Sequence, residues 1–169
     1  MKEQTSRPDI KPEWSFAEKI LQILCPLIFL TGIVLLITSW GSLPVSVPTH
    51  FDAAGIPDSY GPKSQLLLLP IINAGLYLMI TVFERFPRIF NFPVDITEEN
   101  AQYEYQTGRE MMVCLKTEVV GIFTYMLWRS VETAKGVFNG MGYWFVIVTL
   151  ALIFGSMTYY IIRMFRHKG

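Results

Sequence analysis

Three long runs of uncharged, mostly apolar residues constrain this chain more than any other feature of its sequence. They cover residues 20–40, 65–83 and 142–162, and none of them contains Asp, Glu, Lys or Arg. An α-helix rises about 1.5 Å per residue, so about 20 residues cross the hydrocarbon core of a bilayer, which is about 30 Å thick. The three runs therefore predict membrane-spanning helices.

A fourth apolar segment, residues 111–128, contains Lys116 and Glu118, so it either spans the bilayer or lies along its surface. The basic residues of the connecting segments distinguish these alternatives, because Lys and Arg are enriched on the cytoplasmic side of membrane proteins. If all four segments span, one side holds Lys63, Arg129 and Lys135. The other side then holds ten basic residues, which are Lys2, Arg7, Lys11, Lys19, Arg85, Arg88, Arg109, Arg163, Arg166 and Lys168.

This asymmetry favours four spans with both termini in the cytoplasm. With only three spans, Arg163, Arg166 and Lys168 would lie outside the cell, against the charge rule. We therefore predict an all-α membrane protein, a four-transmembrane-helix bundle that forms one integral membrane domain over residues 1–169. The sequence leaves its oligomeric state open. The expected spans are residues 20–40, 65–83, 111–128 and 142–162, with an extracytoplasmic loop at residues 41–64.

The composition agrees with a lipid bilayer as the main partner. Charged residues make up 17% of the chain, against about 25% in soluble domains. The 14 basic and 14 acidic residues balance, so no nucleic-acid partner is expected. Cys25 and Cys114 lie inside apolar runs without a CxxC motif, which favours packing roles and predicts neither a metal nor another cofactor. The first apolar run lacks a small-residue cleavage site, so we expect an uncleaved helix rather than a signal peptide.

The extracytoplasmic loop is the main candidate site, because it concentrates polar and turn-forming residues in the stretch PTHFDAAGIPDSYGPKS. In extended backbone His50 and Asp52 point the same way, and a turn at Gly55 brings Asp58 back toward His50. A His with two carboxylates suits a divalent cation or acid–base chemistry. Two other readings are that these side chains only hold the turns together or that they recognise an extracytoplasmic ligand. The candidate ligand-binding residues are His50, Asp52, Asp58, Tyr60 and Lys63.

The same stretch carries a family resemblance. The segment LPVSVPTHFDAAGIPDSYGPKSQLLLLPIINAGLYLMI resembles the small membrane domain of unknown function found in Sdp-type immunity proteins of bacteria. The matching positions are Leu43, Pro44, Pro48, His50, Gly55, Asp58, Gly61 and Lys63. The later ITEENAQYEYQTGREMMVCLK is similar to the cytoplasmic block that follows the second span in such proteins. The resemblance implies a protein of the bacterial inner membrane, and some members protect a cell from a secreted peptide toxin and signal its presence. It implies no catalytic residues.

The segment between the second and third spans, residues 84–110, is predicted to be cytoplasmic. Asp95 or Thr97 is a candidate N-cap for a helix that runs directly into the third span. Acidic residues in its first turn would stabilise the helix, because they interact favourably with the positive end of the helix dipole. This helix is either a solvated extension of the span or a surface for a cytoplasmic regulatory protein. The residues proposed for that surface are Glu98, Glu99, Tyr103 and Glu104.

The strongly polar residues of interest within the predicted spans are Asn73, Lys116 and Glu118. The stem of Lys116 is long enough to reach the membrane surface, whereas Glu118 lies deeper and is expected to pair across helices or to be protonated. Such residues mark ion pathways in some proteins, so a small transporter or channel component using Glu118 is one alternative function. A membrane enzyme or metal site at His50, Asp52 and Asp58 is another. No HExxH, GxSxG or phosphate-binding glycine loop is present, so we favour a non-enzymatic protein that senses a ligand.

Overall fold

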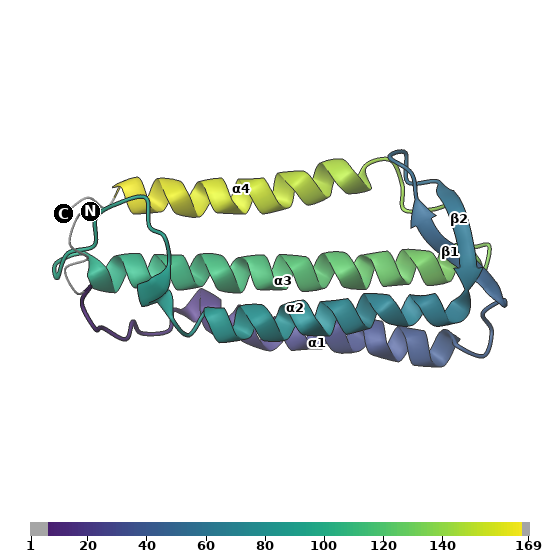
Figure 1. Ribbon diagram of the computed structural model, residues 1–169, viewed down its shortest axis with the longest axis horizontal. Helices are drawn as coiled ribbons and strands as arrows, with labels where there is room; N and C mark the ends of the chain where they lie inside the picture. The colour runs from purple at the N-terminus through teal and green to yellow at the C-terminus, as the bar shows by residue number, and fades with distance from the viewer. Residues whose placement is uncertain (1–6, 167–169) are drawn as a thin grey trace.

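The computed structural model describes residues 7–166 and contains four long helices that run side by side (Figure 1). They are α1 (Phe16–Ser39), α2 (Leu68–Phe83), α3 (Ala101–Ala134) and α4 (Phe145–Arg166). A short 3₁₀ helix, η1 (Lys63–Leu67), leads directly into α2, and another, η2 (Pro87–Ile89), follows it. All four helices, with η1 and α2 taken together, are long and apolar enough to cross a membrane, which confirms a mostly helical chain with four candidate spans.

The bundle has two distinct ends, which we call the termini end and the hairpin end (Figure 1). Both chain termini lie at the termini end. A two-stranded sheet of β1 (Ser46–Phe51) and β2 (Pro57–Pro62) covers the hairpin end. Lys2 and Lys168, which contribute to the predicted charge asymmetry, lie outside the described residues.

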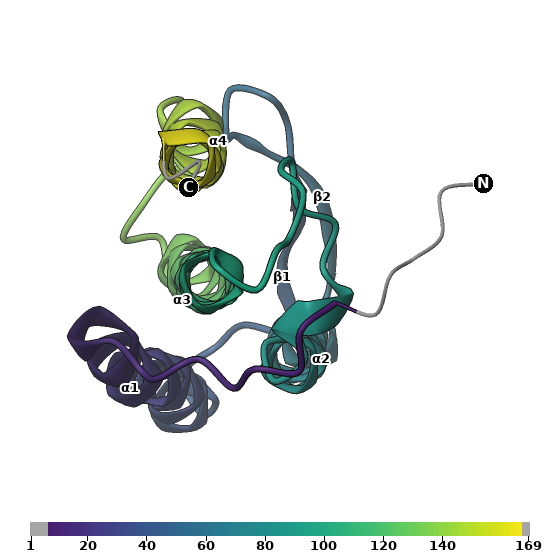
Figure 2. The ribbon, with the colours of Figure 1, turned by 90° about the vertical axis from the view of Figure 1, so that its left-hand side faces the viewer.

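Helix α3 is the centre of the bundle, because each of the other helices packs against it. Helix α4 packs mainly on α3 and stands apart from α1 and α2 in the view along the bundle (Figure 2). Apart from Met164 near its end, α4 has no buried residue within the described chain. The rest of this candidate span is therefore not covered by the other helices.

Helix α1 begins four residues earlier than the apolar run predicts, because a capping box extends it. The Ser15 hydroxyl accepts a hydrogen bond from the Glu18 backbone N–H at 3.2 Å, and the Glu18 carboxylate accepts one from the Ser15 N–H at 2.6 Å. A polar first turn is thereby joined to the apolar span.

Helix α3 is continuous over 34 residues, which corresponds to about 51 Å at 1.5 Å per residue. It therefore includes the predicted extension beyond residues 111–128. Its N-cap is Asn100 rather than Asp95 or Thr97, because Thr97 and Asn100 exchange hydrogen bonds through their side chains and close a turn before the helix. Glu98 and Glu99 consequently precede the helix instead of occupying its first turn.

The extracytoplasmic loop was expected to contain turns, and it forms a β-hairpin. The strands β1 and β2 pair antiparallel, with irregular register around His50. The connecting turn is held by Asp52, whose carboxylate accepts hydrogen bonds from the N–H groups of Ala54 at 2.9 Å and Ile56 at 2.8 Å. Gly55 completes the turn with a φ of 77°, a conformation that glycine adopts without steric cost.

The hairpin turn is docked on the connection between α3 and α4. The backbone N–H of Met141 donates a hydrogen bond to the Gly55 carbonyl at 2.8 Å. Gly140 has a φ of 139°, and a Cβ atom at this position would collide with the Gly55 carbonyl oxygen. The close approach of these two loops therefore needs glycine at position 140, and it joins the hairpin to the start of α4.

Candidate functional site

A cavity of about 420 Å³ lies beneath the hairpin, between the ends of three helices. Most of its lining is apolar, from Leu66, Leu68 and Leu69 on one side and Phe145 and Val146 on the other. Residues from β1, η1, α2, α3 and α4 contribute, so the cavity exists only because the hairpin bridges the gap between α2 and α4. The remaining lining residues are Pro48, Thr49, His50, Phe51, Asp52, Gly55, Gln65, Met126, Ser130 and Met141.

Two polar side chains in the cavity form no hydrogen bond with the described part of the chain. Ser130 is 3% exposed, and its hydroxyl makes no hydrogen bond with any residue of the described range 7–166. Gln65 also lines the cavity, and its carboxamide makes no hydrogen bond within that range. The Ser130 hydroxyl is thus free to form a hydrogen bond with a molecule in the cavity. Polar atoms of a bound molecule would therefore be stabilised at Ser130, while its apolar part fills the remaining space.

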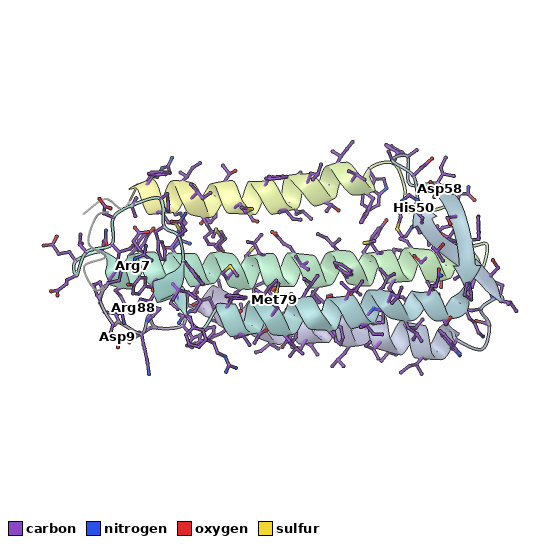
Figure 3. The ribbon with its side chains drawn as sticks, viewed as in Figure 1. Arg7, Asp9, His50, Asp58, Met79 and Arg88 are labelled. Atoms are coloured by element: carbon purple, nitrogen blue, oxygen red, sulfur yellow. The ribbon has the colours of Figure 1, made fainter. Side chains whose placement is uncertain are left out.

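His50 and Asp58 are brought together at the rim of this cavity, as the sequence predicts. The Nδ1 atom of His50 lies 2.5 Å from Oδ1 of Asp58, and the two side chains come from adjacent strands (Figure 3). A carboxylate only accepts hydrogen bonds, so Nδ1 carries the hydrogen. Both side chains are about half exposed or more, at 68% and 46%. The pair thus links the two strands of the hairpin, and both side chains stay exposed at the protein surface.

The predicted triad of His50, Asp52 and Asp58 does not assemble. One oxygen of the Asp52 carboxylate accepts two backbone hydrogen bonds of the turn, which is the structural role that the sequence left open. Among residues 7–166, no group of three or more His, Cys, Asp and Glu side chains is arranged to hold a metal ion. His50 and Asp58 are therefore a pair on the rim of the cavity.

The other two predicted ligand-binding residues lie away from the cavity lining. Tyr60 is 61% exposed on β2. The Lys63 ammonium donates a hydrogen bond to the Trp40 carbonyl at 3.1 Å and lies 5.1 Å from the centre of the Trp40 ring. Lys63 thus ties the end of α1 to the start of η1, which is a structural role.

Lys116 does not extend to the membrane surface, which corrects the expectation from its long side chain. It is fully buried and forms an ion pair with Glu84 at 2.8 Å. Its ammonium also donates to the Gln22 carboxamide oxygen at 2.8 Å and to the Thr81 hydroxyl at 3.3 Å. Because Glu84 and Gln22 come from the end of α2 and from α1, Lys116 satisfies all its hydrogen-bonding needs inside the bundle.

Asn73 and Glu118 each pair across helices, and they do not pair with each other or with Lys116. Asn73 donates to the Val120 carbonyl at 3.4 Å, which joins α2 to α3. The carboxyl group of Glu118 lies 3.0 Å from the Ser156 hydroxyl of α4 and 3.6 Å from the Cys114 sulfur. Glu118 therefore faces α4, while Lys116 faces α1 and α2.

The termini end contains a second polar cluster that the sequence does not predict. Arg109 of α3 forms an ion pair with Glu18 of α1 at 2.7 Å, and its guanidinium lies 4.2 Å from the centre of the Trp14 ring. It also donates hydrogen bonds to the carbonyls of Pro12 and Glu13. This cluster fastens the chain before α1 against the extension of α3.

The predicted partner surface at this end is only partly exposed. Glu98 and Glu99 are exposed, and Tyr103 is half-buried, with its ring 5.8 Å from the guanidinium of Arg163. Glu104 is completely buried, so it does not belong to an exposed surface. The reason is that the loop after α2 packs over the first turns of α3, where Phe92, Ala101 and Tyr105 form an apolar cluster with Met164.

Several residues of the candidate site escape prediction because their chemistry is ordinary and their positions are far apart. Met126, Ser130 and Phe145 look like routine span residues, and nothing near them marks a cavity. The one signal present is the group of glycines at positions 140 and 142, just before α4. Their contact with Gly55, where the hairpin turn meets the α3–α4 connection, is visible only in the tertiary structure.

Comparison with known proteins assigns no activity to this chain. Residues 27–74 match the model of a family described as a domain of unknown function (DUF1648), and this match covers about the second half of α1, the hairpin and the start of α2. A protein of Archaeoglobus fulgidus described as uncharacterized is 35% identical, with the alignment covering 38% of this chain and 43% of that protein. The chain thus spans less than half the length of this relative. No solved structure matches the chain.

Proposed function

We propose that this chain is a non-enzymatic membrane protein of the immunity or signalling type, which binds an amphipathic peptide in the cavity at the hairpin end. The observation that carries the proposal is the cavity of about 420 Å³ with an apolar lining and with the hydroxyl of Ser130, which forms no hydrogen bond among residues 7–166. A secreted, membrane-active peptide toxin has the matching chemistry. The resemblance to Sdp-type immunity proteins supports the same ligand class.

The proposed orientation places the hairpin outside the cell and both termini in the cytoplasm of a bacterial cell. The even number of candidate spans puts the termini at one end of the bundle (Figure 1). Among the described residues, the termini end holds most of the basic side chains, including Lys19, Arg88 and Arg166. Positive charge of this kind is retained on the cytoplasmic side during insertion. The cavity then faces peptides that arrive from outside.

The proposed relay runs along α3. Ser130 near the end of this helix lines the cavity, and Arg109 near its start holds the chain before α1 through Glu18. A continuous helix transmits displacement along its axis because its backbone hydrogen bonds resist bending. The exposed residues Glu98 and Glu99, just before α3, are the proposed contact for a cytoplasmic partner.

Filling the cavity is expected to abolish protection against a peptide toxin. The chain is expressed in a bacterium that an Sdp-type peptide toxin kills, and survival is counted after exposure. Met126→Trp places a large ring in the cavity, so survival is expected to fall to that of cells without the protein. Met79→Trp is the matched control, because Met79 lies on α2 outside the cavity lining and is 48% exposed (Figure 3).

The comparison of the two variants separates the binding site from general damage to the protein. Both must reach the membrane in equal amounts, as measured by immunoblotting of membrane fractions. Full protection by Met126→Trp would show that the cavity does not bind the peptide. Absence of protection by the unaltered protein would contradict the immunity function itself.

The proposed membrane orientation predicts where reporter proteins fused to the chain are active. A fluorescent protein that folds only in the cytoplasm, fused after Gly169, is expected to fluoresce. Alkaline phosphatase, which is active only outside the cytoplasm, is expected to be active when inserted in the α3–α4 connection after Val137, which is 60% exposed. An active phosphatase at the C-terminus would contradict four spans with both termini inside.

A further inference from the structure

Glu118 is partly buried at the contact between α3 and α4, and it differs from three buried acidic residues of the bundle that have basic partners. These three carboxylates each contact a basic side chain within 2.8 Å, in the pairs Glu18–Arg109, Glu84–Lys116 and Glu110–Arg163. Glu118 forms no ion pair within the described residues 7–166, although it lies in the middle of a candidate span. An isolated ionised carboxylate in such a place costs several kcal/mol.

The hydrogen bonds of Ser156 show how this cost is avoided. Its Oγ lies 3.0 Å from Oε2 of Glu118 and also 3.0 Å from the carbonyl oxygen of Ile153 in the preceding helical turn. A hydroxyl has one hydrogen, so it donates to only one of these two acceptors. Both contacts are satisfied when Ser156 donates to Ile153 and Glu118, in its protonated form, donates to the Ser156 oxygen.

The groups around Glu118 supply no charge that would compensate an ionised form. The thiol of Cys114, one turn earlier on α3, lies 3.6 Å away and is a weak donor. Tyr160 on α4 interacts with Cys114 and is a neutral phenol. Lys116 is directed to the opposite side of α3, where Glu84 and Gln22 occupy it. Asn73 of α2 bonds to the Val120 carbonyl.

We propose that Glu118 is a proton-binding site within the membrane, at the contact between α3 and α4. At neutral pH its carboxyl group carries a proton and donates it to the Ser156 oxygen. Releasing the proton places a negative charge in a contact on which α4 depends, because α4 packs mainly on α3. Deprotonation therefore admits water or separates α4 from α3. This site lies apart from the hairpin cavity, so its existence does not depend on the proposed peptide ligand.

Dicyclohexylcarbodiimide, a lipid-soluble reagent, tests the proposal directly on the full chain in lipid nanodiscs. A protonated carboxyl adds across one C=N bond of the reagent, so that its oxygen bonds to the central carbon and its proton moves to a nitrogen. The O-acylisourea then rearranges to a stable N-acylurea. Mass spectrometry of peptides is expected to find the adduct at residue 118 and not at the ion-paired Glu84 or Glu110. A water-soluble carbodiimide is expected to leave Glu118 unmodified.

Infrared spectroscopy supplies a second readout that does not depend on reagent access. The unaltered protein is expected to show the carbonyl band of a protonated carboxylic acid at neutral pH, and Glu118→Gln is expected to lose it. Ser156→Ala removes the acceptor of the proton, so the band is expected to shift to higher frequency. Glu104→Gln is the control for the other buried acid without an ion pair in residues 7–166, and it is expected to retain the Glu118 band.

The outcomes decide between three states of the site. Labelling at residue 118 together with a band that Glu118→Gln removes supports a bound proton. No band and no labelling at neutral pH would show an ionised carboxylate and overturn the proposal. Labelling that sodium chloride suppresses and potassium chloride does not would show that the site binds sodium instead, which also overturns it.

Discussion

Lys116→Met is expected to lower the free energy of unfolding by about 3–5 kcal/mol, the range found when one partner of a buried ion pair is removed. The substitution leaves the Glu84 carboxylate buried without its ion-pair partner, because both residues are at most 3% exposed. Glu84 would retain only the hydrogen bond from the Gln22 carboxamide. Because the pair joins the end of α2 to the centre of α3, the whole bundle is affected. Unfolding in detergent micelles, followed by circular dichroism against denaturant, measures the loss.

Two further variants identify the cause of this loss. Adding Glu84→Gln to Lys116→Met removes the uncompensated charge, so most of the lost stability is expected to return. Lys135→Met is the matched control, since the pair between Lys135 and Glu132 is partly exposed and such pairs contribute about 0–1 kcal/mol. Equal losses from Lys116→Met and Lys135→Met would contradict a special contribution from the buried pair.

Gly140→Ala is expected to detach the hairpin from the α3–α4 connection. The added Cβ would collide with the Gly55 carbonyl oxygen, and backbone on one side must move to relieve the overlap. The hydrogen bond from the Met141 N–H to that carbonyl is lost in the process. Gly140→Ala is expected to lower the free energy of unfolding by more than a strained backbone conformation alone, which costs about 1–3 kcal/mol. Because Gly55 and Met141 also line the cavity, toxin protection is expected to fall with it.

Gly136→Ala is the control that separates contact from backbone strain. Gly136 also has a positive φ, 77°, but a Cβ there meets nothing within 4 Å. Gly136→Ala is expected to lower the free energy of unfolding by about 1–2 kcal/mol, which is the cost of a non-glycine residue in the left-handed conformation. The hairpin is expected to stay docked. Hydrogen exchange of the amides of residues 140–142 measures the docking. Faster exchange in both variants to the same extent would show that the Gly55–Gly140 contact does not hold the hairpin.

The number and approximate positions of the four helices follow from residue type alone. A lipid bilayer imposes a minimum apolar length, so an uncharged run of about 20 residues is diagnostic without any knowledge of the fold. The extension of α3 was also predictable, because residues 101–128 contain no proline that would end a helix. The helix starts were less predictable. Ser15 caps α1 through a local capping box, whereas α3 begins after Asn100, whose side chain bonds back to Thr97 and does not cap the helix.

The partners of the polar residues were beyond prediction, with one exception. His50 and Asp58 lie eight residues apart around a turn, so their contact is local and was expected. The partners of Lys116 come from α1 and α2, and the partner of Glu118 comes from α4. The side of α3 that each helix contacts depends on how the helices rotate and pack, and a single sequence does not reveal this arrangement.

The sequence by itself determined that this chain has four helices long and apolar enough to cross a membrane and that a polar loop separates the first two. It did so because the hydrophobic effect and chain length act on each segment separately. The tertiary structure alone decided where the cavity lies, because its lining residues come from segments up to about 100 positions apart, from Pro48 to Val146. It also decided that Lys116 is ion-paired and Glu118 is not, because a side chain's charge partner is set by the packing of neighbouring helices.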